Sequence, residues 1–248
     1  MLPLSYPGLA VYAVVLIGAF AVRSAAGFGA VLVAVPLLAL VMPLPIAVSV
    51  ASALTLVTSV RYVSRDWRHI AWRHFAIMMA YTLVGVGLGF YFFSMLDEHV
   101  LRRGLAAFLI LYSIYVLRTG GVPLPLPVRW HGALAAGTGV LGGLCSALFG
   151  GGAGPIYVVY FSVVRLEREV FRATMTMVML VSSTLRVGGY ADFGFYAGPT
   201  LTLLAVGLPL IVIGSWLGSH FVTRLNPRVF SLCVGGLVML SGVALLLR

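Results

Sequence analysis

Charge is scarce in this 248-residue chain, because Asp, Glu, Lys and Arg together make up only 9% of the residues. A soluble domain carries about 25% charged residues, since its surface must be hydrated. Hydrophobic residues account for 61% of the sequence, and the mean hydropathy is +1.09. The chain therefore has too little charge to cover a water-facing surface, which excludes a soluble fold and predicts a surface that faces lipid.

Lysine is absent, so all 16 basic residues are arginines, and 6 acidic residues leave a formal net charge of +10. A basic balance of this size suggests nucleic-acid binding only when the charge gathers on one face or along one helix. Here the arginines stand between apolar runs. We therefore expect no nucleic acid among the partners.

Metal-binding and nucleophilic residues are also few. The two cysteines, Cys145 and Cys233, lie inside apolar runs without CxxC spacing, so neither a disulfide framework nor a thiolate metal site is expected. An intramembrane protease could be drawn from Ser146 and His220, but Ser146 has no Gly-x-Ser-x-Gly context, and no His-Glu-x-x-His motif occurs. The sequence predicts no metal, no cofactor, no catalytic residue and no enzymatic activity.

What the chain does contain is a series of apolar runs close to the length of about 20 residues that one membrane crossing needs. They cover approximately residues 45–60, 74–94, 100–117, 131–149, 170–187, 199–221 and 229–247. No basic residue precedes Arg23, so we expect the first apolar segment to be retained and not cleaved as a secretory signal. The pattern predicts an all-α polytopic membrane protein with about eight to ten membrane segments.

Two apolar stretches, residues 8–42 and 131–164, are interrupted by glycine. The first is broken at Gly27-Phe28-Gly29 and the second at Gly150-Gly151-Gly152-Ala153-Gly154. Each stretch predicts a helix, a Gly-rich break and a short second helix, which could be re-entrant or could cross as a second thin span. Irregular backbone is tolerated at membrane depth only where it is buried in protein or lines a cavity.

The two halves of the chain resemble each other. At an offset of 129 residues the matches are Gly85/Gly214, Leu88/Leu217, Gly89/Gly218, Phe92/Phe221, Leu96/Leu225 and Val100/Val229; at an offset of 125 they are Gly27/Gly152, Gly29/Gly154 and Arg61/Arg186. We interpret residues 1–120 and 131–248 as two homologous membrane repeats, joined by a Pro-rich cytoplasmic linker at residues 121–130. The paired Gly-x-x-x-Gly motifs are expected to be close-packing helix faces.

The arginines predict the orientation. Cytoplasmic loops of membrane proteins are enriched in basic residues, so the arginine-rich stretch 61–74 is placed in the cytoplasm. If each broken stretch makes an even number of crossings, the other arginines, apart from those of the mixed-charge loop 97–103, also fall on that side: Arg23 and the segments 118–129, 165–172 and 224–228. Each half then has an odd number of crossings, so the halves are inverted repeats. Both chain ends are expected outside.

The two breaks are the predicted substrate site. A helix that begins inside the membrane presents unpaired N–H groups and the positive end of its dipole, and glycine lets an anion approach them closely. Hydroxyls and one arginine on neighbouring spans supply further donors, although such hydroxyls can equally bond their own backbone. The candidate substrate-binding residues are Gly27, Phe28, Gly29, Ser52, Thr55, Cys145, Ser146, Gly150, Gly151, Gly152, Gly154, Ser183 and Arg186.

Arg186 stands out because the residues around it carry no loop-like charge. A buried arginine needs a partner, which here could be either Asp192 or the substrate itself. All six carboxylates map to loops or span ends, so the sequence shows no proton relay at the midplane. An anion that leaves a cell with a negative interior gains about 2.3 kcal/mol per charge per 100 mV. Export therefore requires no proton coupling.

At the breaks the sequence resembles the sulfite exporter TauE/SafE family of small bacterial membrane transporters. The resemblance spans nearly the whole chain and is carried by Gly27-Phe28-Gly29-Ala30 with Val35-Pro36, and by Leu148-Phe149 followed by the second glycine cluster and Pro155. Ala30 and Val31 stand where the family shows further glycine. The resemblance implies a multi-pass protein of the bacterial inner membrane that transports sulfite, a sulfonate or a related small organic anion.

We therefore expect a transporter that exports a small anion, sulfite or an organosulfonate. The alternatives are a passive anion channel, a transporter of another small organic carboxylate, and a structural subunit of a larger membrane complex. The expected partners are the small anion and the lipid bilayer, and a homodimer is a further expectation.

Overall fold

The computed structural model describes residues 6–26, 28–119, 131–151, 153–164, 166–220 and 227–247. Within these ranges the chain forms ten α-helices and one short 3₁₀ turn (η1), with no β-strand. The elements are α1 (Tyr6–Ala26), α2 (Ala30–Leu38), α3 (Leu44–Asp66), η1 (Trp67–His69), α4 (Trp72–Met95), α5 (Glu98–Thr119), α6 (His131–Phe149), α7 (Gly154–Val163), α8 (Arg168–Asp192), α9 (Gly198–His220) and α10 (Pro227–Leu246). The predicted all-α architecture is confirmed, while the predicted linker 121–130 lies outside the described residues.

The long helices are those that a membrane requires. Seven of them (α1, α3, α4, α5, α6, α8 and α9) have the length and hydropathy of a membrane span, and α10 contributes the shorter apolar stretch Leu232–Leu246 within the described chain. Trp67 and Trp72, at the junction of α3 and α4, are about half exposed, as residues of an interfacial aromatic belt are. The chain is a multi-pass membrane protein.

Each glycine break separates a full-length helix from a short one that turns back. Helix α1 is followed by the 9-residue helix α2, and α6 is followed by the 10-residue helix α7. Gly29 precedes α2 with a φ of 97°, and Gly150 and Gly151 precede α7 with φ of 73° and 115°, a region that residues with a Cβ rarely adopt. Pro155 is the second residue of α7, where its missing N–H costs nothing.

Two segments that were expected to be loops are helical. Residues 98–103 form the first turns of α5, where Glu98 accepts hydrogen bonds from the Leu44 N–H at 3.1 Å and from Arg102 at 2.8 Å. An acidic residue in the first turn is stabilised by the helix dipole. Helix α3 continues through Arg61 and Arg65, because no Gly or Pro ends the helix before the 3₁₀ turn. Both arginine side chains are exposed, so the helix buries neither charge.

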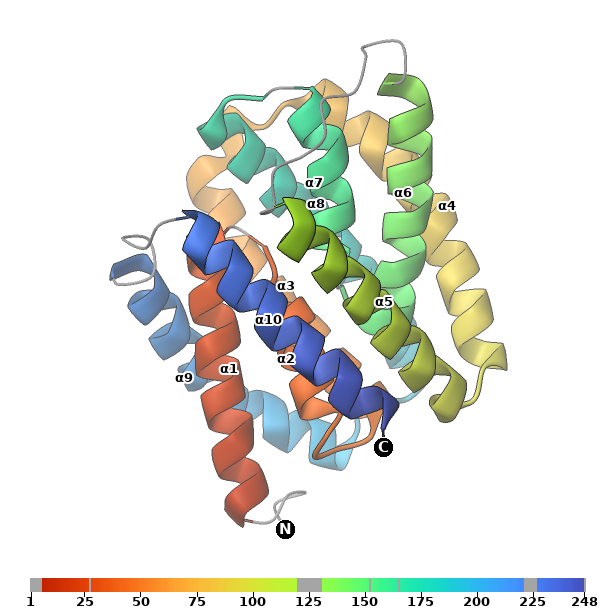
Figure 1. Ribbon diagram of the computed structural model, residues 1–248, viewed down its shortest axis with the longest axis vertical. Helices are drawn as coiled ribbons and strands as arrows, with labels where there is room; N and C mark the ends of the chain where they lie inside the picture. Colours follow the sequence, from red (N-terminus) through yellow and green to blue (C-terminus); the bar gives the residue numbers. More distant parts are fainter. Residues whose placement is uncertain are drawn as a thin grey trace.

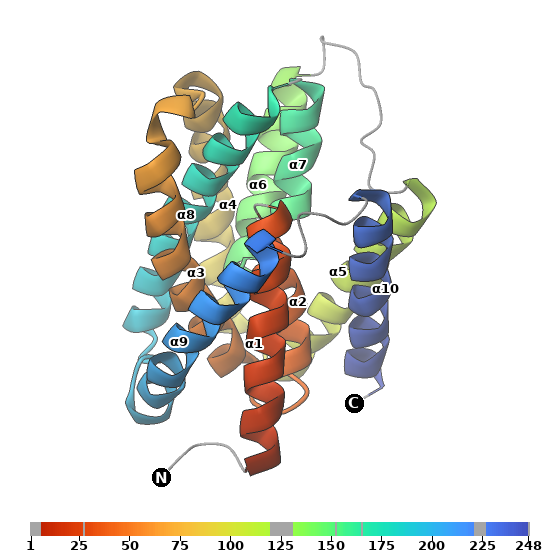
Figure 2. The ribbon, with the colours of Figure 1, turned by 90° about the vertical axis from the view of Figure 1, so that its left-hand side faces the viewer.

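The helices of the two halves pack against each other in matching pairs. Helix α1 packs on α9 as α6 packs on α4, α3 packs on α8, and α5 packs on α10. Figure 1 and Figure 2 show α1, α3 and α5 running in one direction along the bundle, and their counterparts α6, α8 and α10 running in the other. These directions are those that inverted halves would have; the inverted repeat itself stays a prediction.

Glycines permit the closest of these helix contacts. A Cβ added at Gly85 or Gly89 of α4 would overlap backbone atoms of Val140 and Leu144 in α6. Their matched residues in α9 are placed alike: a Cβ at Gly214 or Gly218 would overlap the backbone of α1. The expectation that both Gly-x-x-x-Gly motifs are packing faces is confirmed.

The start of α1 and the end of α10 lie at the same end of the bundle (Figure 1). The opposite end, where α3 ends and α4 begins, is called the arginine-rich end below, since it carries Arg61, Arg65, Arg68 and Arg73. By the enrichment of basic residues in cytoplasmic loops it is the predicted cytoplasmic side.

Candidate functional site

Arg186 lies at the centre of the site. It belongs to α8, and its side chain is completely buried. Its guanidinium donates hydrogen bonds to three serine hydroxyls from three helices: Ser52 of α3 at 3.3 Å, Ser182 of α8 at 2.8 Å, and Ser146 of α6. Neutral hydroxyls satisfy N–H groups but cannot neutralise the charge.

The backbone of the second glycine break completes the surroundings of Arg186. Ser52 donates a hydrogen bond to the Gly150 carbonyl at 3.2 Å, so the same hydroxyl links the break to the guanidinium. A Cβ added at Gly151 would lie 2.8 Å from Nη2 of Arg186 and 3.1 Å from Cζ. Gly151 is therefore required both by its φ of 115° and by the guanidinium beside it.

Nη2 of Arg186 is buried and has no hydrogen-bond partner in the described part of the chain. The two ion pairs among the described residues, Arg102–Glu98 and Arg172–Asp66, do not include it, and Asp192 is exposed. Of the two partners expected for Arg186, Asp192 thus makes no ion pair with it. A buried cation that lacks a counter-charge is costly, and an anion that contacts Nη2 would offset that cost.

The predicted site residues fall into three groups. Ser52, Ser146, Gly150, Gly151 and Arg186 are in direct contact with one another, as described above.

The two breaks also meet, because the Phe28 ring packs against Gly154: a Cβ added there would lie 2.8 Å from Cδ2 of the ring. Gly29, half-buried, begins α2 from the same break. The second group thus joins the starts of α2 and α7. Gly27 and Gly152 lie outside the described residues.

The residues of the third group make no hydrogen bond to Arg186. The Ser183 hydroxyl donates to the Leu180 carbonyl of its own helix at 2.9 Å. Cys145 is half-buried among apolar residues as a free thiol. Thr55 is buried one turn beyond Ser52, and its hydroxyl has no hydrogen-bond partner among the described residues.

Sequence reasoning left three contributors out of the site. Ser182 precedes Arg186 by one helical turn, and this spacing of four was the signal that could have found it. Tyr190, one turn further along α8, donates to the Ala147 carbonyl at 2.6 Å. Arg23 was interpreted only as a cytoplasmic charge, whereas its side chain is 3% exposed; its place just before a break was the available signal.

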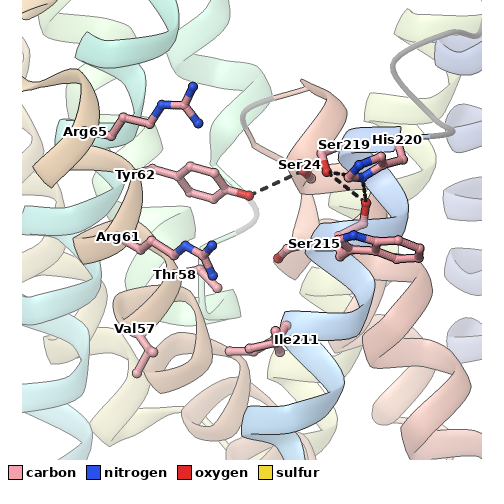
Figure 3. Close-up of a pocket in the computed structure, with 12 residues that line it drawn as sticks. Ser24, Val57, Thr58, Arg61, Tyr62, Arg65, Ile211, Ser215, Ser219 and His220 are labelled. Atoms are coloured by element: carbon pink, nitrogen blue, oxygen red, sulfur yellow. Dashed lines mark hydrogen bonds between the residues drawn. The ribbon is translucent and has the colours of Figure 1, made fainter.

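A cavity of about 490 Å³ lies between α3, α9 and the end of α1, and its lining includes none of the residues in contact with Arg186. Figure 3 shows Arg61, Tyr62 and Arg65 on α3 facing Ser215, Ser219 and His220 on α9, with Ser24 between them. Ser24, Arg65 and His220 are at or near the ends of α1, α3 and α9, on the side of the arginine-rich end. An anion entering from that end would meet cationic and hydroxyl groups.

A cluster of aromatic rings lies on the opposite side of the site. Phe93 of α4 lies 5.5 Å from Tyr190, 5.7 Å from Phe193 and 6.0 Å from Phe195, measured between ring centroids. Phe90 also contacts Tyr190, at 5.6 Å. Tyr190 follows Arg186 by one turn, on the side away from the arginine-rich end, so this aromatic cluster stands between Arg186 and the predicted outer surface.

Tyr196, in the α8–α9 connection, fixes that outer side to α3 by donating to the Ser49 carbonyl at 2.9 Å. Burial raises the pKa of its phenol, and the charge of Arg186 opposes this shift.

No group of three or more His, Cys, Asp or Glu side chains that could hold a metal occurs in the described chain. The donors around the site are guanidinium and hydroxyl groups, which suit an anion and not a cation.

Comparisons with known proteins agree with this chemistry. The family profile described as "Sulfite exporter TauE/SafE" matches residues 11–245. A curated protein from Cupriavidus necator, named "Probable sulfite/organosulfonate exporter TauE", is 27% identical over 210 residues, which cover 83% of this chain and 80% of that protein. No solved structure matches the chain significantly.

Proposed function

This chain belongs to the sulfite exporter TauE/SafE family, and from that premise we propose that it exports sulfite or a small organosulfonate across the bacterial inner membrane. The observation that carries the proposal is Arg186, a fully buried guanidinium with an unpartnered Nη2 and without a carboxylate partner among the described residues. The similar protein from Cupriavidus necator carries sulfite/organosulfonate export in its name.

The geometry around Arg186 suits a sulfite or sulfonate group. Both present several oxygens on one sulfur, and a guanidinium N–H donates a strong, charge-assisted hydrogen bond to such an anionic oxygen. Nη2 is the donor still open, and the Ser52, Ser146 and Ser182 hydroxyls hold the other N–H groups in place. A carboxylate could use the same donor, so discrimination would come from the third oxygen that a sulfite or sulfonate group carries and a carboxylate lacks.

The charge distribution supports export. None of the acidic side chains is buried, so the described chain offers no carboxylate relay inside the membrane. The cavity lies toward the predicted cytoplasmic side, and we assign the aromatic cluster as the barrier on the other side. The membrane potential alone then drives an anion outward, by about 2.3 kcal/mol per charge per 100 mV.

Flux measurements with purified protein in liposomes test the proposal. Wild-type protein should release loaded sulfite or methanesulfonate with saturable kinetics, faster when the protein's cytoplasmic side is made negative. Arg186→Gln should lower the flux on the order of 100-fold, equivalent to about 3 kcal/mol, because the charged contact is lost. The matched control is Arg73→Gln, which removes one exposed arginine that lines neither described cavity and should transport normally.

The outcomes separate the alternatives. Flux that does not saturate would indicate a passive channel, and faster flux of acetate than of methanesulfonate would indicate a carboxylate transporter. Undiminished flux in Arg186→Gln would refute the assigned site.

Two finer expectations are part of the same proposal. We expect the anion to cross unaltered, without enzymatic conversion, so mass spectrometry should recover the loaded compound outside. We also expect a homodimer, which light scattering of the detergent-solubilised protein would detect as twice the mass of the 248-residue chain.

A further inference from the structure

A second buried arginine lies nearer the arginine-rich end. Arg23, close to the end of α1, is 3% exposed. Its Nη2 donates to the Ser59 hydroxyl at 2.6 Å, while its Nε is buried without a hydrogen-bond partner in the described chain. Neither ion pair found among the described residues involves Arg23. It therefore repeats the arrangement of Arg186: a buried cation, serine contacts and an unused N–H donor.

Arg23 lines a second cavity, which shares Ser24, Tyr62, Arg65 and Ser219 with the larger one. The volume is about 250 Å³, and the lining residues are Arg23, Ser24, Tyr62, Arg65, Asp66, Arg172, Thr176 and Ser219. The lining includes three arginines and one aspartate, and that aspartate is engaged by Arg172 at 3.2 Å. The cavity thus carries excess positive charge and has hydroxyl groups from four helices, which is the chemistry of an oxyanion site.

One face of α3 connects the two arginines. Ser52 contacts Arg186, and Ser59, seven residues later, contacts Arg23. At 1.5 Å per residue these serines are about 10 Å apart along the helix. Thr55 lies between them on the same face, with a buried hydroxyl that lacks a hydrogen-bond partner in the described chain.

We propose that Arg23, with Ser59 and the neighbouring cavity, forms a second binding site for a small oxyanion, which receives the anion from the arginine-rich end and passes it along Thr55 to Arg186. This inference rests on the proposed function, since it assigns an entry site to the same transport path. Two successive sites of moderate affinity suit conduction, because an anion must bind well enough to enter and weakly enough to leave.

Equilibrium binding in a background without Arg186 tests the second site. Isothermal titration of the purified protein with sulfite should still detect one site in Arg186→Gln, and that binding should weaken about tenfold or more in the double variant Arg23→Gln/Arg186→Gln. The double variant Arg73→Gln/Arg186→Gln is the matched control for loss of one further positive charge, and it should bind as Arg186→Gln does. In the Arg186→Gln background, Arg23→Lys should bind sulfite more tightly than Arg23→Gln, because lysine restores the positive charge.

Transport kinetics give a second readout that does not require Arg186→Gln to fold. In wild-type background, Ser59→Ala and Arg23→Gln should raise the KM for sulfite about tenfold while changing the maximal rate much less, because the final site at Arg186 remains. A role of Arg23 in folding alone would instead lower thermal stability and leave the KM unchanged.

The failures can be told apart. Absence of both sulfite binding and sulfite flux in the wild-type protein would overturn the proposed function. Normal wild-type transport, with no residual binding in Arg186→Gln and an unchanged KM in Arg23→Gln, would overturn the second site alone.

Discussion

Replacing Gly151 by alanine tests how closely the second glycine break is fitted to Arg186. The added Cβ would lie 2.8 Å from Nη2 and 3.1 Å from Cζ of the guanidinium, distances shorter than van der Waals contact. The guanidinium is held by three serines and is fully buried, so it can yield only by breaking those hydrogen bonds. The change thus acts on the geometry of the arginine without removing its charge.

Two separate costs follow from this substitution. A residue with a Cβ in a left-handed conformation costs roughly 1–2 kcal/mol, and Gly151 has a φ of 115°. Moving Nη2 away from the bound anion sacrifices a charged hydrogen bond of about 1.5–3 kcal/mol. The first cost lowers the stability of the protein, while the second weakens sulfite binding about 10- to 100-fold.

Gly194→Ala separates the two costs. Gly194 has a φ of 75°, but a Cβ added there meets no atom within 4 Å, so only the backbone strain is introduced. Thermal unfolding and sulfite titration should be measured for both variants. Gly194→Ala should lose stability and keep its affinity, whereas Gly151→Ala should lose both. Equal sulfite affinity in Gly151→Ala and wild type would refute the fitted contact between this break and Arg186.

Three further predictions concern packing, charge and the outer side. Gly85→Ala should destabilise the protein by about 1–3 kcal/mol, because the added Cβ overlaps the Val140 carbonyl. The control Gly87→Ala, whose Cβ meets no atom within 4 Å, should be neutral or slightly stabilising in thermal unfolding. Equal losses of stability in the two variants would contradict the packing face. Arg186→Met should raise the melting temperature without anion, since it removes an uncompensated buried charge. Sulfite should then raise the melting temperature less than in wild type, because only the site at Arg23 remains. A lower melting temperature without anion would contradict this reasoning. Phe93→Ala removes the central ring of the aromatic cluster. The variant should lose about 3 kcal/mol of stability, and liposomes that contain it should leak methanesulfonate faster than those with wild type. An unchanged leak would show that the cluster is not the outer barrier.

Much of the fold was predictable because a lipid environment permits few arrangements. Backbone groups must be satisfied within each segment, so an apolar run of sufficient length becomes a helix. The breaks after α1 and α6 were equally readable, since several closely spaced glycines interrupt an otherwise apolar run. The ends of helices were not: Glu98 belongs to α5 because it accepts from the Leu44 N–H, a contact between segments far apart in the chain.

The candidate site was predictable in its residue types and not in its contacts. The sequence offered Asp192 and the substrate as partners of Arg186, and it offered backbone bonding as an alternative role for every membrane hydroxyl. Ser183 follows that alternative, whereas Ser52 and Ser146 contact the guanidinium. Nothing in the local sequence separates these serines, because the helix to which each one points is decided by packing.

The amino-acid sequence by itself determined that this protein is a helical membrane protein of two glycine-broken halves, because scarce charge and long apolar runs admit few alternatives. Only the tertiary structure decided that Arg23 and Arg186 are both buried without a carboxylate partner among the described residues. The physical reason is that burial and pairing depend on groups brought together from α1, α3, α6 and α8, and a sequence pattern records spacing along one helix but not the charge on the next.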